Sequence, residues 1–291
     1  MPPAARIRRP KSDGRCIHCR ERLVKHTKDH VFPRSWYPDT TPKGVERWTA
    51  PSCGRCNGKL GALEEELLVF FACCIDPTKP AAKGLYGRVR RMMGLGVEGL
   101  TPQEKAHREA RRRKLLRESE PYSPDMLSHV IPGLGPHREA PESLQRQLTI
   151  EVETVHAVIQ KIVRGCEYWL GDGRIVEPPY EITIMFPTET PELVNRVMAA
   201  FAFGPVHLGP GLRIRRGSAH DEPLATLYEL VIWETMTVYA SILPAEPEQA
   251  AQKMAHEEIA VHAYYHWERR GRPIGSPEVD WYWAIENLRG A

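Results

Sequence analysis

The residues best suited to chemistry lie near the N-terminus, beginning with four cysteines in two C-x-x-C pairs, CIHC and CGRC: Cys16, Cys19, Cys53 and Cys56. Each pair turns two thiolates toward one point, and two such pairs form a tetrahedral four-sulfur site. A site closed by four thiolates has no open position, so we predict one structural zinc ion here. His18 and His26 are further nitrogen donors that this site does not need.

An acid–base pair, Asp29-His30, lies between the cysteine pairs, and Asn57 directly follows the second pair. An imidazole can take a proton from a water molecule that attacks phosphorus. Carboxylate and amide oxygens can hold a hard divalent cation, which stabilises charge on a scissile phosphate. We expect the zinc to fold the two segments together, so that Asn57 meets the Asp-His pair. This chemistry is phosphodiester hydrolysis.

In this combination the residues resemble the HNH nuclease family, which has a ββα-metal fold. The resemblance runs from CIHC through DHVFPRS to CGRCNGKLGALE, about residues 15–66. It implies a metal-dependent endonuclease with His30 as the general base. It also implies that Asp29 and Asn57 hold a catalytic divalent cation, Mg²⁺, Mn²⁺ or another such ion. DNA is the expected substrate, although these residues do not separate DNA from RNA.

The sequence departs from the family at Trp48. Many members have an Asn at this place, five residues before the third cysteine, where it steadies the catalytic His. The departure keeps a rival interpretation open, in which the chain is a non-enzymatic zinc-ribbon protein that binds nucleic acid or regulates. Glu64, two helical turns beyond Asn57, is a further candidate ligand, but a solvated glutamate is the simpler interpretation.

The net charge of the chain is only +3, but the basic residues are unevenly spread. Residues 1–28 hold nine Lys or Arg against two acidic residues, and residues 82–118 hold eleven against four. Such clustering predicts a polyanionic partner, although a solvated helix face has the same composition. Five side chains are candidate nucleic-acid contacts: Arg34, Lys59, Arg111, Arg112 and Arg113.

The elements around these residues predict an α+β multidomain chain. Its expected parts are a flexible basic arm (1–14), the zinc-bound HNH domain (15–76), a basic helical region with a Pro/Gly linker (77–142), an α+β domain with an antiparallel sheet (143–247) and a helical pair (248–291). In the second part, NGKLGALEEELLVFFACC has helical apolar spacing, and Pro77 should end that helix.

Local signals predict elements in the later parts. Thr101 and Glu104 form a capping-box pattern. A helix is expected over LQRQLTIEVETVHAVIQKIVRG with Gly165 at its end, and GDG (171–173) reads as a hairpin turn. YEITIMF, ATLYELVIW and ETMTVYASIL should be strands, with PELVNRVMAAFAF a helix between the first two.

The tail IAVHAYYHWERRGRPIGSPEVDWYWAIENL resembles a small bacterial helical domain of unknown function, which implies two packed helices and no particular chemistry. The spacing of His256, His262 and His266 does not bring all three to one helix face, so we expect no metal cluster there. Three tryptophans should instead pack the helix pair: Trp267, Trp281 and Trp283.

The cysteine spacing and the hydropathy indicate the cellular compartment in which the protein is expected. Metal spacing rather than disulfide spacing favours a reducing cytoplasm. No apolar run reaches membrane-spanning length, and no signal peptide is visible, so we expect a cytoplasmic protein without a membrane partner. The sequence does not predict an oligomeric state.

Overall fold

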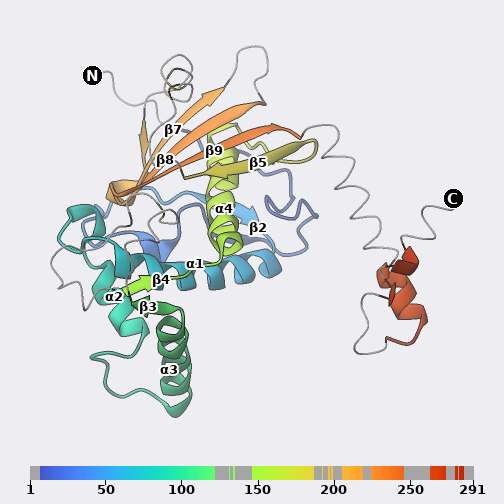
Figure 1. Cartoon of the computed structure of the whole chain (residues 1–291). Coiled ribbons are helices and arrows are strands. Elements are labelled where there is room, and N and C mark those ends of the chain that lie inside the picture. The colour runs from blue at the N-terminus through green and yellow to red at the C-terminus, as the bar shows by residue number, and fades with distance from the viewer. Residues whose placement is uncertain are drawn as a thin grey trace. The chain divides into compact units, whose positions relative to one another are not determined.

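The structure is a computed structural model (Figure 1), and it describes residues 7–121, 131, 134, 146–186, 192, 196, 198, 205–218, 224–245, 263–272, 279–280 and 282–284. The chain forms two compact units. The first comprises Met1–Glu177 and Ile182–Leu243, and the second comprises Pro178–Glu181 and Pro244–Ala291. Helices and antiparallel strands are mixed, so the α+β class is confirmed. None of the described helices is long and apolar enough to cross a membrane.

Residues 15–76 form what we call the hairpin–helix module. Strand β1 (Thr27–His30) pairs antiparallel with β2 (Thr49–Ser52), and helix α1 (Gly54–Cys74) follows directly. A short 3₁₀ turn, η1 (Arg34–Trp36), comes after β1. Helix α1 ends before Pro77, as predicted. The second cysteine pair therefore lies where the first N–H groups of a helix have no intrahelical partner.

The apolar face of α1 packs into a core that the module shares with the rest of its unit. Every residue from Leu67 to Ala72 is buried. The rings of Trp36 and Trp233 lie 5.1 Å apart, and Trp233 Nε1 donates a 2.8 Å hydrogen bond to the carbonyl of Trp36. Phe71 packs edge-on against Trp36. Contacts of this kind stabilise by about 0.5–1.5 kcal/mol beyond burial itself, so the module and the sheet stabilise each other.

The basic region contains a 3₁₀ turn, η2 (Pro80–Ala82), and two helices, α2 (Leu85–Met92) and α3 (Pro102–Arg117). The predicted capping box is confirmed, because Thr101 accepts from the Glu104 N–H while the Glu104 carboxylate accepts from the Thr101 N–H. Strands β3 (Ser119–Pro121) and β4 (Arg146–Leu148) then pair antiparallel.

Helix α4 (Val152–Leu170) begins and ends later than the sequence predicted. Residues expected to begin it form β4 instead, and Gly165 lies inside the helix rather than at its end. The physical reason is close packing, because a Cβ at position 165 would lie 2.7 Å from Cγ2 of Val31. The GDG turn is also different: Asp172 and Gly173, both with positive φ, close the end of α4 and do not join two strands.

A five-stranded sheet has the order β5-β9-β8-β7-β6, and its strands are β5 (Tyr180–Met185), β6 (Val206–His207), β7 (Leu212–Ser218), β8 (Thr226–Ile232) and β9 (Met236–Pro244). The pairings from β6 to β9 are antiparallel, and another 3₁₀ turn, η5 (Gly209–Gly211), precedes β7. The predicted strands are confirmed. In Figure 1, α4 stands between this sheet and α1.

A buried ion pair also joins α4 to the sheet. The guanidinium of Arg216 on β7 lies 2.9 Å from the carboxylate of Glu167, which is fully buried. At the end of α4, Tyr168 donates to the carbonyl of Pro10 at 3.4 Å. Part of the predicted basic arm therefore lies against this helix.

In the C-terminal tail, residues 263–269 are helical, as are 279–280 and 282–284. His266 lies 2.7 Å from Asp280 and stacks on Trp283 with a 4.0 Å ring separation. His266 therefore pairs with a carboxylate and a ring. Several predictions fall outside the described residues: His256, His262, Trp281, most of the 121–142 linker and most of the helix predicted over 191–203.

Candidate metal centre and the Asp29 site

The four predicted zinc ligands come together. Their four sulfur atoms all lie within 4.8 Å of one another: those of Cys16, Cys19, Cys53 and Cys56. Backbone N–H groups point at two of them, from Cys53 to the Cys16 sulfur and from Cys56 to the Cys53 sulfur, each at 3.4 Å. Such donors favour thiolates, the form that binds zinc. In the described part of the chain, no other group of three or more His, Cys, Asp or Glu side chains gathers this way.

Asp29 is buried, with 4% of its surface exposed, and both carboxylate oxygens have protein partners. Oδ2 lies 2.8 Å from Nε2 of His18, and Oδ1 lies 3.1 Å from the Lys161 ammonium of α4. Burial alone would raise the pKa of Asp29, but the His18 hydrogen bond and the Lys161 charge outweigh it, so this pKa lies below its ordinary value. An ionised carboxylate only accepts, so Nε2 of His18 is the donor.

Lys161 has four oxygen partners although its side chain is only 1% exposed. Besides Asp29, its ammonium lies 2.8 Å from a carboxylate oxygen of Glu64. It also donates to the backbone carbonyls of His30 and Val31. Burial raises the pKa of Glu64, against the lowering effect of Lys161. One ammonium thus joins α4 to both β1 and α1.

These contacts test whether Asp29 fits a catalytic divalent cation. A magnesium ion needs oxygen ligands at about 2.0–2.1 Å and keeps several waters. The Asp29 carboxylate is closed off from solvent, holds a donor on each oxygen, and has a positive charge 3.1 Å away. The arrangement does not fit such an ion. Glu64, for which a solvated side chain was the simpler expectation and a ligand role the alternative, is instead paired with Lys161.

His30 has the properties of a base. Its side chain is half-buried, and Nδ1 is buried without a hydrogen-bond partner in the described structure. Burial lowers the pKa of His30, and the positive charges of Lys161 and Arg34 lower it further. The ring is therefore neutral at neutral pH, which is the form that accepts a proton.

Trp48, which replaces the expected Asn, is a packing residue. It is buried, and its ring stacks on Trp169 of α4 at 4.8 Å with 2° between the planes. The Trp169 N–H also donates to the carbonyl of Thr49 on β2. The position where the HNH resemblance leads one to expect an Asn therefore fastens α4 to the hairpin.

Asn57 lies in the first turns of α1, close to the start of β1. Its Nδ2 donates to Oγ1 of Thr27 at 3.2 Å, and that hydroxyl donates to the carbonyl of Ser52. This chain of bonds holds the helix against both strands of the hairpin. The role of Asn57 as a cation ligand stays a prediction.

The residues predicted to contact phosphate differ in whether their charge is already paired with a carboxylate of the protein. Arg34 and Lys59 are exposed, as is Arg112. By contrast, Arg111 pairs with Glu65 of α1 at 2.8 Å, and Arg113 pairs with Glu109 at 2.6 Å.

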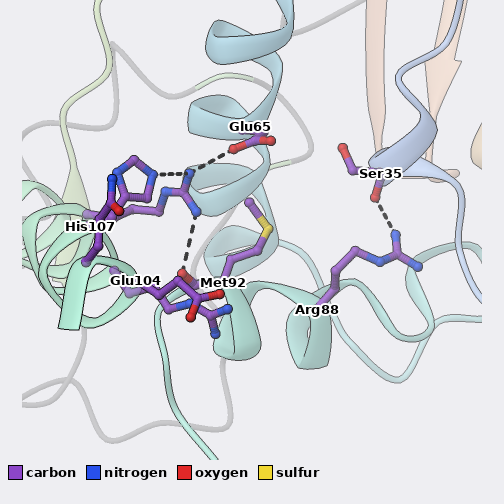
Figure 2. A pocket seen from close by; sticks show the side chains of 9 residues that line it. Ser35, Glu65, Arg88, Met92, Glu104 and His107 are labelled. Carbon is purple, nitrogen blue, oxygen red and sulfur yellow. Dashed lines mark hydrogen bonds and ion pairs between the residues drawn. The ribbon is translucent and has the colours of Figure 1, made fainter. Parts of the chain in front are cut away.

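Arg111 also borders an open pocket of about 590 Å³ between α1, α2 and α3. Its guanidinium lies 2.8 Å from a carboxylate oxygen of Glu65 and 3.5 Å from both the His107 ring and the carbonyl of Met92, three residues that Figure 2 labels at this pocket. Across the pocket, Arg88 donates to the carbonyl of Ser35. The arginines of this pocket serve first to hold the helices together.

Lys161 is the residue that sequence reasoning missed. It lies 131 positions from His30, whose carbonyl it contacts. One signal was available: within VIQKIVRG the lysine lies among Val158, Ile159 and Ile162, on the buried face of its helix. A lysine at such a position needs an acidic partner.

Comparison with known proteins adds information only for the tail. Residues 254–289 match a family described as a protein of unknown function (DUF2934). This agrees with the resemblance seen in the tail sequence and says nothing of the hairpin–helix module. No curated protein and no solved structure matches the chain.

Proposed function

We propose that the hairpin–helix module acts on the phosphodiester backbone of DNA as an HNH-type endonuclease, with His30 as the general base. The observation that carries the proposal is the state of His30 at the end of β1. Its ring is half-exposed and neutral, and the positive charges of Arg34 and Arg47 act on it. A neutral imidazole near cationic groups suits deprotonation of water beside a phosphate.

The chemistry of the proposal rests on residues of this chain. His30 takes the proton of the attacking water, and the exposed guanidinium groups of Arg34 and Arg47 meet the charge of the phosphate. The family resemblance would add a Mg²⁺ or Mn²⁺ ion at Asp29 and Asn57. The contacts of Asp29 argue against that ion, so the proposed chemistry uses no cation at Asp29.

Cleavage of plasmid DNA tests the proposal, with magnesium, manganese and EDTA in separate reactions. We expect His30→Ala to reduce cleavage by about a hundredfold to ten-thousandfold, the usual contribution of a general base. His26→Ala is the matched control, because His26 is an exposed histidine in the same hairpin segment. Equal cleavage by His30→Ala and wild type would place the reaction elsewhere.

A second candidate function is nucleic-acid binding without hydrolysis. The specific observation in its favour is that α4 contacts Asp29 and Trp48, the two positions where the HNH resemblance would put a metal ligand and the Asn that steadies the catalytic His. Lys161 pairs with Asp29, and Trp169 stacks on Trp48. In that case the wild type binds DNA and cuts it under none of the ionic conditions above.

Salt dependence tests the binding that both candidates share. Each phosphate contact contributes a change of about one to the slope of log affinity against log salt. We expect Arg112→Ala to lower that slope, because Arg112 is exposed. Arg111→Ala should leave the slope unchanged, because Arg111 is held by Glu65. The opposite ranking would mean that the pairs on α3 open when DNA binds.

A further inference from the structure

The ion pair at Asp29 joins two parts of the chain that the sequence treats as separate. Asp29 lies on β1 and Glu64 on α1, whereas Lys161 comes from α4, after the basic region. The Lys161 ammonium lies 3.1 Å from the first carboxylate and 2.8 Å from the second. Two carboxylates and one ammonium leave one negative charge, and His18 donates to that cluster as well.

The partners of Lys161 are those that a hard cation would take. Carboxylate and backbone carbonyl oxygens are typical ligands of hard divalent ions. Here two carboxylates and the carbonyls of His30 and Val31 surround one ammonium. An ion bound to the same Asp29 oxygen would lie within a few ångströms of the Lys161 charge, and the repulsion would be poorly screened in this buried place.

The surroundings of Lys161 keep it in place. Gly165, one helical turn along α4, approaches Val31 so closely that a Cβ there would lie 2.7 Å from Cγ2. The Trp48–Trp169 stack and the hydrogen bond from Trp169 to the carbonyl of Thr49 fasten the next turn to β2. Lys161 is thus held at the carboxylates by packing on the same helix, rather than by its own flexible chain.

We infer that Lys161 is the permanent cation of the Asp29 site, a built-in ammonium in the place where the HNH resemblance puts a divalent metal ion. Asp29 and Glu64 then bind no divalent cation and serve to dock α4 on the module. The inference does not depend on whether the module cleaves DNA.

Manganese binding tests the inference on zinc-loaded, full-length protein. Free Mn²⁺ is followed by electron paramagnetic resonance during a titration of wild type and Asp29→Asn. We expect superimposable binding curves, because Asp29 has no free place for the ion. A manganese site that wild type has and Asp29→Asn lacks would overturn the inference.

Nuclear magnetic resonance of the lysine side chains tests whether the Lys161 ammonium is the cation of the Asp29 site. The Lys161 ammonium should give a slowly exchanging ¹⁵Nζ signal, because it is buried, while exposed Lys59 should give none. Asp29→Asn should shift the Lys161 signal, and Mn²⁺ should leave it sharp in wild type. Absence of the signal, or its broadening by Mn²⁺, would overturn the inference. Neither measurement uses cleavage, so failure of the proposed function gives a separate result.

Discussion

Two clusters of the hairpin–helix module differ in the cation that suits them. In the first, four cysteine sulfurs converge within 4.8 Å, and the backbone N–H groups of Cys53 and Cys56 point at two of them. In the second, the Asp29 carboxylate converges with Glu64 on the ammonium of Lys161. Both are clusters of negative groups brought together by the same hairpin and helix. Only the second has a positive side chain at its centre.

The difference shows how a structure separates a metal site from an internal ion pair. Four thiolates at close range repel one another unless a metal ion joins them, so zinc is the predicted partner of the cysteine cluster. Two buried carboxylates also require positive charge, and a lysine can supply it without any metal. Residue types alone do not reveal whether a metal ion or a lysine supplies the positive charge. The positive group that lies nearest to the carboxylates in the structure does reveal it.

The largest effect should come from loss of the zinc cluster. Structural zinc contributes about 10–16 kcal/mol of apparent binding energy to folding in small zinc modules. Cys53→Ser should therefore lose zinc and unfold the module. Because Trp36 packs on Trp233, the melting temperature of the sheet should fall too. Elemental analysis and circular dichroism measure the two losses.

Cys73→Ser is the control for that change, because Cys73 lies on α1 outside the cluster. It should retain zinc and melt close to wild type. If Cys53→Ser also kept its zinc and its melting temperature, the cysteine cluster would not be a structural metal site, and the contrast between the two clusters would be lost.

Loss of Lys161 should come next. Lys161→Met leaves buried Asp29 and half-buried Glu64 without a counter-charge, and breaking a buried pair in this way costs about 3–5 kcal/mol. Urea unfolding should show that loss, while Lys59→Met at an exposed site should stay within about 0.5 kcal/mol of wild type.

Adding Asp29→Asn to Lys161→Met sharpens the comparison, because it removes one of the unpaired charges. The double variant should be more stable than Lys161→Met alone, since the two residues contact each other directly. Simple additivity of the two single losses would show that they do not act as a pair.

A smaller effect is expected at the helix that presents Lys161. Gly165→Ala should destabilise by about 1–3 kcal/mol, because the added Cβ overlaps Val31. Gly61→Ala is the matched control, since nothing lies within 4 Å of its Cβ on α1. It should be stabilising by about 0.5–1 kcal/mol, from helix propensity alone. Equal responses in thermal unfolding would mean that α4 does not press on the hairpin.

The smallest effect should be at Asn57, which directly follows Cys56 and contacts Thr27 of β1. Asn57→Ala removes one hydrogen bond to Thr27, a contribution of about 0.5–1.5 kcal/mol. Zinc content should not change. A loss of stability as large as that of Lys161→Met would show that Asn57 does more than hold the helix to the hairpin.

Local chemistry made much of this fold predictable. The α1 helix, its end before Pro77, the α3 capping box and the strands β8 and β9 followed from spacing within short segments. Helix α4 was placed only in part. Gly165 looked like a helix end, and only the approach of Val31 explains why glycine stands inside the helix.

The candidate site divides in the same way. The four cysteines were predictable because C-x-x-C spacing sets the local geometry of each pair, and metal chemistry supplies the rest. Asp29 and His30 are adjacent in the sequence, but their partners were not predictable, and the contact that Asn57 makes is with Thr27. Trp48 looked like a missing catalytic Asn, and its partner Trp169 lies far along the chain.

By itself the sequence determined which groups are available: four thiolates, a carboxylate beside an imidazole, and a lysine on the apolar face of a helix. Only the tertiary structure decided which positive charge faces Asp29. That choice depends on the packing of α4 against a hairpin about 130 residues away, as the Lys161–His30 contact shows. Spacing within a segment fixes angles and short distances, whereas a buried charge takes its partner from whatever element the whole core brings beside it.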